Sequence, residues 1–314
     1  MEKVEIPGDA TYTPVALTDL LIAAPLASRL LLGATLPGRI VQAAALGVYA
    51  GSAVKDWAAR QHVRRVDFLR EYGADVFDLE RMPREERVRE IGVLAERLND
   101  GYVAERAAGS REEIAREANR HLTSYLASVT GQRVETSSAI RNFSIAYLIF
   151  PFAYGTCDIL SGDVAIFRDT GIFEPHVIAH EFCHRKGYWK ELHAQVLAYL
   201  AMVSSGEPVM VQSAHAERLH RHLRVLAGAD VGEFSRLVDG LSLRPELARA
   251  FHALRPTPGA YESAVGKVMR RIYDERMKLT GQNGLSDYDD GFTSFLWTFG
   301  RSGTARQPRA LALV

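Results

Sequence analysis

Apolar residues recur every three to four positions through most of the chain, which is the spacing of amphipathic helices. The segments with this pattern are 57–72, 83–98, 110–129, 190–201, 208–226, 232–238, 244–254, 261–279 and 287–299. Two shorter segments, 144–150 and 163–167, are instead rich in β-branched and aromatic residues, as strands are. The pattern therefore predicts an α+β protein that is mainly α-helical and contains a small sheet.

The N-terminal region is more hydrophobic than the rest of the chain. Residues 15–33 and 40–54 consist mostly of Leu, Ala, Ile and Val, and the basic residues Lys55 and Arg60 follow directly. A membrane-spanning helix needs about 20 uninterrupted apolar residues, which neither stretch provides. We expect a hydrophobic helical hairpin that is buried in the protein, inserted as two short membrane helices, or laid on a membrane surface. The basic residues after it suit a cytoplasmic flank.

The charge balance and the cysteine content argue against a nucleic-acid-binding protein and a disulfide-rich protein. The chain has 314 residues, with 38 basic and 38 acidic side chains and a formal net charge of zero. This balance gives no electrostatic footprint for nucleic acid. The two cysteines, Cys157 and Cys183, are too few for a disulfide framework and favour a reducing, cytosolic setting.

The same pattern divides the chain into four parts. They are an N-terminal arm with the hydrophobic, membrane-associated or buried hairpin (1–54), a helical region (55–130), a domain that carries the candidate chemistry (131–300) and a loose tail (301–314).

The candidate chemistry centres on the motif His180-Glu-Phe-Cys-His184. Histidines four residues apart lie on one face of a helix, so both imidazoles can bind one Zn²⁺. Glu181 is displaced along the helix and can instead accept a proton from a water molecule on the metal. This arrangement is typical of zinc peptidases. It predicts one Zn²⁺ per chain and hydrolysis of a peptide or another amide.

The sequence around the motif supports this interpretation. Pro175 suits the first turn of a helix, and Gly187 suits a left-handed cap at its end. A second helical segment follows and offers a third ligand near its start, either Glu191 or His193. Metzincins place a His six residues after the second motif His, but Lys190 occupies that position here. The strand before the motif either offers its free edge to an extended peptide substrate or only covers the helix.

Three tyrosines are candidates to donate a hydrogen bond to the oxyanion that forms during amide hydrolysis, namely Tyr154, Tyr188 and Tyr288. The alternative for each of them is a packed core residue. We assign the catalytic role to Tyr288.

Two other functions stay open at this point. Glu181 and His184 form a Glu-x-x-His motif, and Glu217 and His220 form a second one. Two such motifs can bind a di-iron centre in a helical bundle and support an oxidase or oxygenase activity, although the arginine-rich segment 215–222 reads as exposed. The third hypothesis is a non-catalytic, membrane-proximal scaffold with a vestigial metal site.

Further short motifs accompany the metal motif in a fixed order. They are Ile149-Phe150-Pro151-Phe152, Gly187, His193-Ala194-Gln195, Tyr273-Asp274, Gly284 and Ser286-Asp287-Tyr288. Over about residues 140–300 this series resembles an uncharacterised bacterial family of membrane-anchored HExxH proteins, related in its motif to gluzincin peptidases.

The resemblance implies a zincin-like core and N-terminal membrane helices. It also implies a location at the bacterial inner membrane or in the cytoplasm. The third ligand of that family, a Glu, aligns with His193. We therefore predict a zinc metallopeptidase with a three-histidine site of His180, His184 and His193, although Glu191 stays an alternative.

Overall fold

The computed structural model describes residues 1–8, 30–33, 35–104, 109–142, 153–159, 161–228, 230–254 and 264–302. The helices are α2 (Leu36–Gln61), α3 (Phe68–Tyr72), α4 (Arg84–Asp100), α5 (Arg111–Thr130), α7 (Glu174–Arg185), α8 (Glu191–Ser204), α9 (Pro208–Ala227), α10 (Val231–Gly240), α11 (Pro245–Ala253), α12 (Ala264–Leu279) and α13 (Asp290–Arg301), with the 3-10 turns η3 (Gly171–Phe173) and η4 (Gly284–Tyr288). The strands are β1 (Glu2–Glu5), β2 (Gln132–Glu135), β3 (Arg141–Asn142), β4 (Gly155–Cys157) and β5 (Val164–Ile166). The protein is thus mainly helical with small sheets, as predicted. The predicted strand at 144–150, most of the stretch 15–33 and nearly all of the predicted tail lie outside the described residues.

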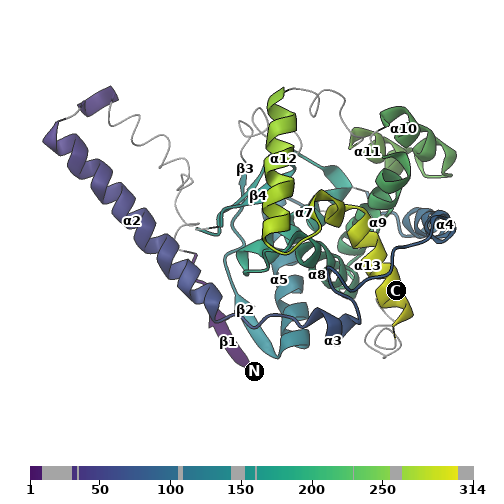
Figure 1. The fold of residues 1–314 in the computed structure, drawn as a ribbon, viewed down its shortest axis with the longest axis horizontal. Helices are drawn as coiled ribbons and strands as arrows, with labels where there is room; N and C mark the ends of the chain where they lie inside the picture. Colours follow the sequence, from purple (N-terminus) through teal and green to yellow (C-terminus); the bar gives the residue numbers. More distant parts are fainter. Residues whose placement is uncertain are drawn as a thin grey trace.

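The core is built around α7 and α8. Helix α7 contacts α5, α8, α9 and the strands β4 and β5, and Figure 1 shows it near the middle of the molecule. Residues 196–202 of α8 are almost completely buried on every side of the helix. A helix that is apolar all round is stable only where neighbours cover it, and α5, α7, α9 and α13 cover α8. This packing fixes α7 and α8 relative to each other.

A three-stranded sheet lies against α7. Its strand order is β3-β5-β4, with β5 parallel to β3 and antiparallel to β4. The predicted strand 163–167 is confirmed as β5. A separate pair, β1 with β2, is parallel. Within the described residues β4 is an edge strand, and it is also the strand that packs most closely on α7.

The turn between α7 and α8 follows the prediction. Pro175 lies in the first turn of α7. After the helix, Gly187 adopts a φ of 95°, which favours glycine, and the backbone N–H of Tyr188 donates to the carbonyl of Cys183 at 2.9 Å. Lys190 then forms the N-cap of α8. This short reversal places the first turn of α8 beside the last turn of α7.

The start of α5 agrees with the sequence prediction, and the region from α2 to α3 does not. In α5 the predicted capping box is confirmed, because Ser110 Oγ accepts from the backbone of Glu113 and the Glu113 carboxylate accepts from the backbone of Ser110. The prediction of one helix over 57–72 is wrong. Helix α2 ends at Gln61, and a new helix begins after Asp67, whose side chain caps it.

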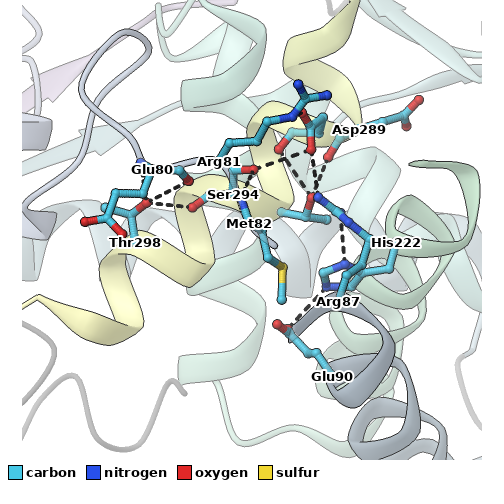
Figure 2. Close-up of polar contacts among 11 residues, drawn as sticks. Glu80, Arg81, Met82, Arg87, Glu90, His222, Asp289, Ser294 and Thr298 are labelled. Atoms are coloured by element: carbon cyan, nitrogen blue, oxygen red, sulfur yellow. Dashed lines mark hydrogen bonds and ion pairs between the residues drawn. The ribbon is translucent and has the colours of Figure 1, made fainter. Parts of the chain in front are cut away.

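Buried charged groups tie α4 to α9 and α13. Arg87 donates to Asp290 at 2.7 Å and to Thr293 at 2.6 Å, and its Nη1 lies 3.2 Å from His222 Nδ1 (Figure 2). The other ring nitrogen of His222 lies 3.3 Å from Glu90 (Figure 2). Because the Arg87 side chain is only 3% exposed, these bonds replace water that the guanidinium has lost.

The segment that leads into α4 is held along α13. The backbone N–H groups of Glu80 and Met82 donate to the hydroxyls of Thr298 and Ser294, at 2.9 and 3.1 Å (Figure 2). Hydroxyl side chains on α13 therefore satisfy backbone groups that have no partner in a helix or a sheet.

Helix α2 stands apart from the helical core, and Figure 1 shows it running away at one side of the molecule. Large apolar side chains along it are exposed, with Ile40 at 59%, Val48 at 67% and Val54 at 63%. Its C-terminal end is anchored, because buried Arg60 donates to the carbonyl of Ile159 at 3.1 Å. Within the part of the chain that the structure describes, no helix has the length and apolar character needed to cross a membrane.

Candidate metal centre

Three donor atoms converge where α7 meets α8. His180 Nε2 lies 3.1 Å and His184 Nε2 lies 3.2 Å from Glu191 Oε2, and the two histidine Nε2 atoms are 3.2 Å apart. The three residues are buried. Among the described residues, this is the only group of His, Cys, Asp or Glu side chains with a geometry that could hold a metal ion.

The spacing of these atoms fits a tetrahedral zinc site. Zinc bonds of about 2.0–2.1 Å place neighbouring tetrahedral ligand atoms about 3.3–3.4 Å apart. The three distances from 3.1 to 3.2 Å lie close to that value. Two imidazoles and one carboxylate are also a ligand set of catalytic zinc, in which a fourth position stays open for water or substrate. His180, His184 and Glu191 therefore suit Zn²⁺ in both geometry and chemistry.

The electrostatics of the cluster reflect the close approach of the carboxylate to the imidazoles. Burial opposes the charged form of Glu191, but His184 and the hydrogen bonds from both histidines outweigh burial and hold the pKa of Glu191 well below its usual range. Burial also opposes the charged form of His184, but Glu191 outweighs it and raises the pKa of His184 to about 9. The protein thus keeps a negative oxygen between two ring nitrogens, as a cation site requires.

Groups beyond the cluster orient His184. Its Nδ1 lies 2.8 Å from the carbonyl oxygen of Tyr188, which can only accept, so Nδ1–H donates and Nε2 faces the cluster. The ring of Trp189 stacks on the imidazole at 5.9 Å with an angle of 6° between the planes. The Arg60 guanidinium lies over the Trp189 ring, 5.7 Å from its centre. The end of α2 is therefore in contact with the surroundings of the site.

Glu181 lies on α7 directly after His180. It is buried, and burial raises its pKa, although His180 and His184 act in the opposite direction. Its side chain lies against strand β4: a Cβ added at Gly155 would be 3.2 Å from Glu181 Cγ and 3.1 Å from the backbone oxygen of Ala165. The absence of a side chain at Gly155 lets the strand approach the carboxylate closely.

Two tyrosines complete the surroundings of Glu191. Tyr273 Oη donates to Glu191 Oε1 at 2.6 Å and lies 3.1 Å from Tyr288 Oη, whose ring is 6.3 Å from the ring of His180. The backbone N–H of Glu191 donates to Gln282 Oε1 at 2.7 Å. The structure therefore brings the predicted Tyr288 to the site. Tyr273 was noted only as part of the Tyr273-Asp274 motif, and Gln282 was not singled out, because neither residue carries a local signal that links it to the metal motif.

His193 does not reach the cluster, so its choice as third ligand over Glu191 is corrected. Its Nε2 lies 2.6 Å from Asp75 Oδ1, and its ring stacks on Phe68 at 3.7 Å. Both contacts lie on a side of α8 that faces α3 rather than α7. Glu191, the alternative in the sequence analysis, is the residue of this helix that faces the two motif histidines.

The second Glu-x-x-His motif is also engaged elsewhere. Glu217 accepts from Gln195 at 2.9 Å and from Arg221 at 2.6 Å, and it is not part of the three-residue cluster. His220 Nε2 lies 3.2 Å from the carbonyl oxygen of Leu254. The expectation that segment 215–222 is exposed is wrong, since nearly all of its side chains are buried. The arginines are paired inside the protein instead of hydrated outside it.

Comparison with known proteins gives one match. A family model described as "Protein of unknown function (DUF3810)" matches residues 170–296. That range contains the three donor residues, Glu181 and both tyrosines of the site. No curated protein and no solved structure matches the chain.

Proposed function

We propose that the protein is a zinc-dependent hydrolase of peptide or other amide bonds, built on a zincin-like core. The observation that carries this proposal is the buried cluster of His180, His184 and Glu191, with its three donor atoms at tetrahedral spacing. The buried carboxyl of Glu181 on the adjacent position of the same helix supplies the group that hydrolysis needs. The ligand set is thus two histidines and a glutamate instead of three histidines.

Each residue has a defined part in the reaction. A bound zinc ion would polarise the substrate carbonyl and lower the pKa of a water molecule to about 7. Glu181 would accept one proton from water as its oxygen attacks the carbonyl carbon, and would deliver that proton to the amine as the C–N bond breaks. Tyr288 would donate a hydrogen bond to the carbonyl oxygen as its charge develops. The products are a carboxylic acid and an amine, which ionise in water to a carboxylate and an ammonium group.

The edge of β4 supports an extended peptide as the substrate. In the pairing with β5, Tyr154 and Asp158 direct their hydrogen-bonding groups toward β5. Hydrogen-bonding groups alternate along an antiparallel strand, so the backbone groups of Gly155 and Cys157 point to the opposite edge. Since Gly155 is beside Glu181, a peptide that paired with this edge would carry its backbone past the proton acceptor.

The exposed apolar surface of α2 supports a location at a membrane surface. Between Arg39 and Lys55 the helix contains no charged residue, and several of its large apolar side chains are more than half exposed. The affinity of a surface helix for a bilayer scales with the apolar area that it buries there and with the attraction of basic residues to anionic lipids, and Arg39 and Lys55 flank the apolar stretch. Flotation with anionic phospholipid vesicles tests this part of the proposal. Recovery of the protein only in the lipid-free fraction would contradict it.

The activity is tested with an unfolded, fluorescently labelled protein as substrate and zinc-loaded enzyme. We expect cleavage by the wild type and by His193→Gln, which changes a residue outside the site. Glu181→Gln should retain zinc and lose activity by a factor of about 10²–10⁴, the usual contribution of a general base. Zinc binding without cleavage of any peptide or protein substrate would favour the scaffold hypothesis. About two irons per chain would favour the di-iron hypothesis.

A further inference from the structure

We infer that Tyr273 is a positioning residue for the metal ligand Glu191, and that metal binding and the seating of helix α12 therefore stabilise each other. This inference rests on the metal site of the proposed function. It concerns a residue on a different part of the chain from the motif, and it makes α12 a component of the site.

The first step is the orientation of the Glu191 carboxylate. Its Oε2 faces both motif histidines, and its Oε1 accepts the hydroxyl of Tyr273 at 2.6 Å. A carboxylate on a flexible side chain can rotate, and a hydrogen bond to one oxygen fixes the direction of the other. Tyr273 thus selects the rotamer in which Oε2 completes the cluster.

The second step is the support that Tyr273 and Glu191 receive from the loop after α12. The backbone N–H of Glu191 donates to Gln282, and the backbone N–H of Leu285 donates to Asp274 at 2.8 Å. Tyr288, on η4, lies within hydrogen-bond distance of Tyr273. The end of α12 and η4 therefore hold the start of α8 through both its backbone and its side chain.

The third step is the limited packing of α12. It packs mainly on η4, and three of its apolar side chains are exposed, with Val268 at 57%, Ile272 at 56% and Leu279 at 88%. Figure 1 shows α12 as an upright helix whose upper end reaches the outer edge of the molecule. The described contacts that hold α12 lie at its C-terminal end, where Met277 is buried, Tyr273 donates to Glu191 and Asp274 accepts from Leu285.

Thermodynamic linkage then gives the coupling. If the bond between Tyr273 and Glu191 favours metal binding, metal binding must favour that bond by the same factor. Metal should therefore hold α12 against the site, and loss of the Tyr273 hydroxyl should weaken metal binding and release α12 together.

The test compares Tyr273→Phe with Tyr125→Phe in the full-length protein. The second variant is a matched control, because it also removes one hydroxyl from a pair of hydrogen-bonded tyrosines. Tyr125 Oη lies 2.9 Å from Tyr72 Oη, and both residues lie away from the cluster. Zinc affinity is measured by competition with a chromophoric chelator. Hydrogen exchange of the peptide that contains α12 is measured with and without zinc.

We expect Tyr273→Phe to bind zinc about 10–100-fold more weakly, the usual effect of losing a partner of a metal ligand, and Tyr125→Phe to bind like the wild type. Zinc should slow exchange in α12 of the wild type and of Tyr125→Phe, but not of Tyr273→Phe. Equal zinc affinity in Tyr273→Phe and the wild type would overturn the inference and leave the proposed function intact. Absence of zinc binding by the wild type would instead overturn the proposed function itself.

Discussion

The buried histidine His215 should make the protein sensitive to mild acid. It lies on α9, it is 9% exposed, and its Nδ1 has no hydrogen-bond partner among the described residues. Burial, reinforced by the positive charges of Arg218 and Arg97, lowers its pKa to about 4. The folded protein therefore holds this imidazole neutral at a pH where an unfolded chain would protonate it.

The change in stability with pH follows from the pKa of His215 in the folded and in the unfolded protein. The unfolded residue titrates near 6.5 and the folded residue near 4, so between them the unfolded chain binds more protons and stability falls as the pH falls. Each pH unit inside this window costs about 1.4 kcal/mol. From pH 7 to pH 5, His215 alone should remove about 2 kcal/mol from the free energy of unfolding.

Urea unfolding of the metal-free wild type and of His215→Gln at pH 7 and pH 5 measures this quantity. We expect the wild type to lose about 2 kcal/mol more than the variant between the two pH values. His252→Gln, which removes a histidine whose side chain is 30% exposed, controls for the change in composition. An identical pH dependence of stability in the wild type and in His215→Gln would refute the reasoning.

Three further predictions concern other parts of the molecule. Gly155→Ala should reduce kcat without loss of zinc, because a Cβ there would meet Ile166 Cδ1 at 3.0 Å, the backbone oxygen of Ala165 at 3.1 Å and Glu181 Cγ at 3.2 Å. Gly92→Ala, with nothing within 4 Å, should leave kcat unchanged, and equal kcat values in the two variants would contradict this. Arg87→Ala should lower the free energy of unfolding by about 3 kcal/mol, because it breaks a buried ion pair. Arg89→Ala, on the exposed face of the same helix, should lower it by less than about 1 kcal/mol, and urea unfolding measures both changes. Zinc should change the tryptophan fluorescence of the wild type, and Trp189→Phe should lose most of that change, because Trp189 stacks on His184. An equal change in the two proteins would contradict this.

Much of the fold could be read from the sequence because helix signals are local. The apolar spacing of α5 and its capping box at Ser110 lie within a few residues of each other, and the structure confirms both. The break between α2 and α3 was missed, although Asp67 is a common helix-capping residue, because apolar residues continue at helical spacing across it. The apolar pattern within a segment thus predicts that a helix is present more reliably than it predicts where the helix begins and ends.

In the candidate metal centre, the two motif histidines could be predicted from local sequence, but the third donor residue could not. His180 and His184 are fixed by their spacing on one helix, so their convergence could be predicted. Glu191 and His193 are two residues apart, which places them about 200° apart around α8, so only one can face α7. Which one does so depends on how α8 is rotated about its axis. Because α8 is apolar on nearly all sides, the apolar pattern does not determine that rotation.

The buried charges on α9 illustrate the same limit. Glu217 and Arg221 look like a solvated surface pair four residues apart. In the fold, Arg221 also reaches Asp289 at 2.8 Å, a residue 68 positions away along the chain. Long-range partners of this kind decide whether a charged segment is buried, and sequence spacing does not reveal them.

The most direct test of the account is the zinc content of protein purified without a chelator, measured by elemental analysis for the wild type, Glu191→Gln and His193→Gln. The structure predicts about one zinc per chain in the wild type and in His193→Gln, and loss of most of the zinc in Glu191→Gln. Zinc that is lost in His193→Gln and retained in Glu191→Gln, or absent from the wild type, would contradict the central claim that His180, His184 and Glu191 form a zinc site.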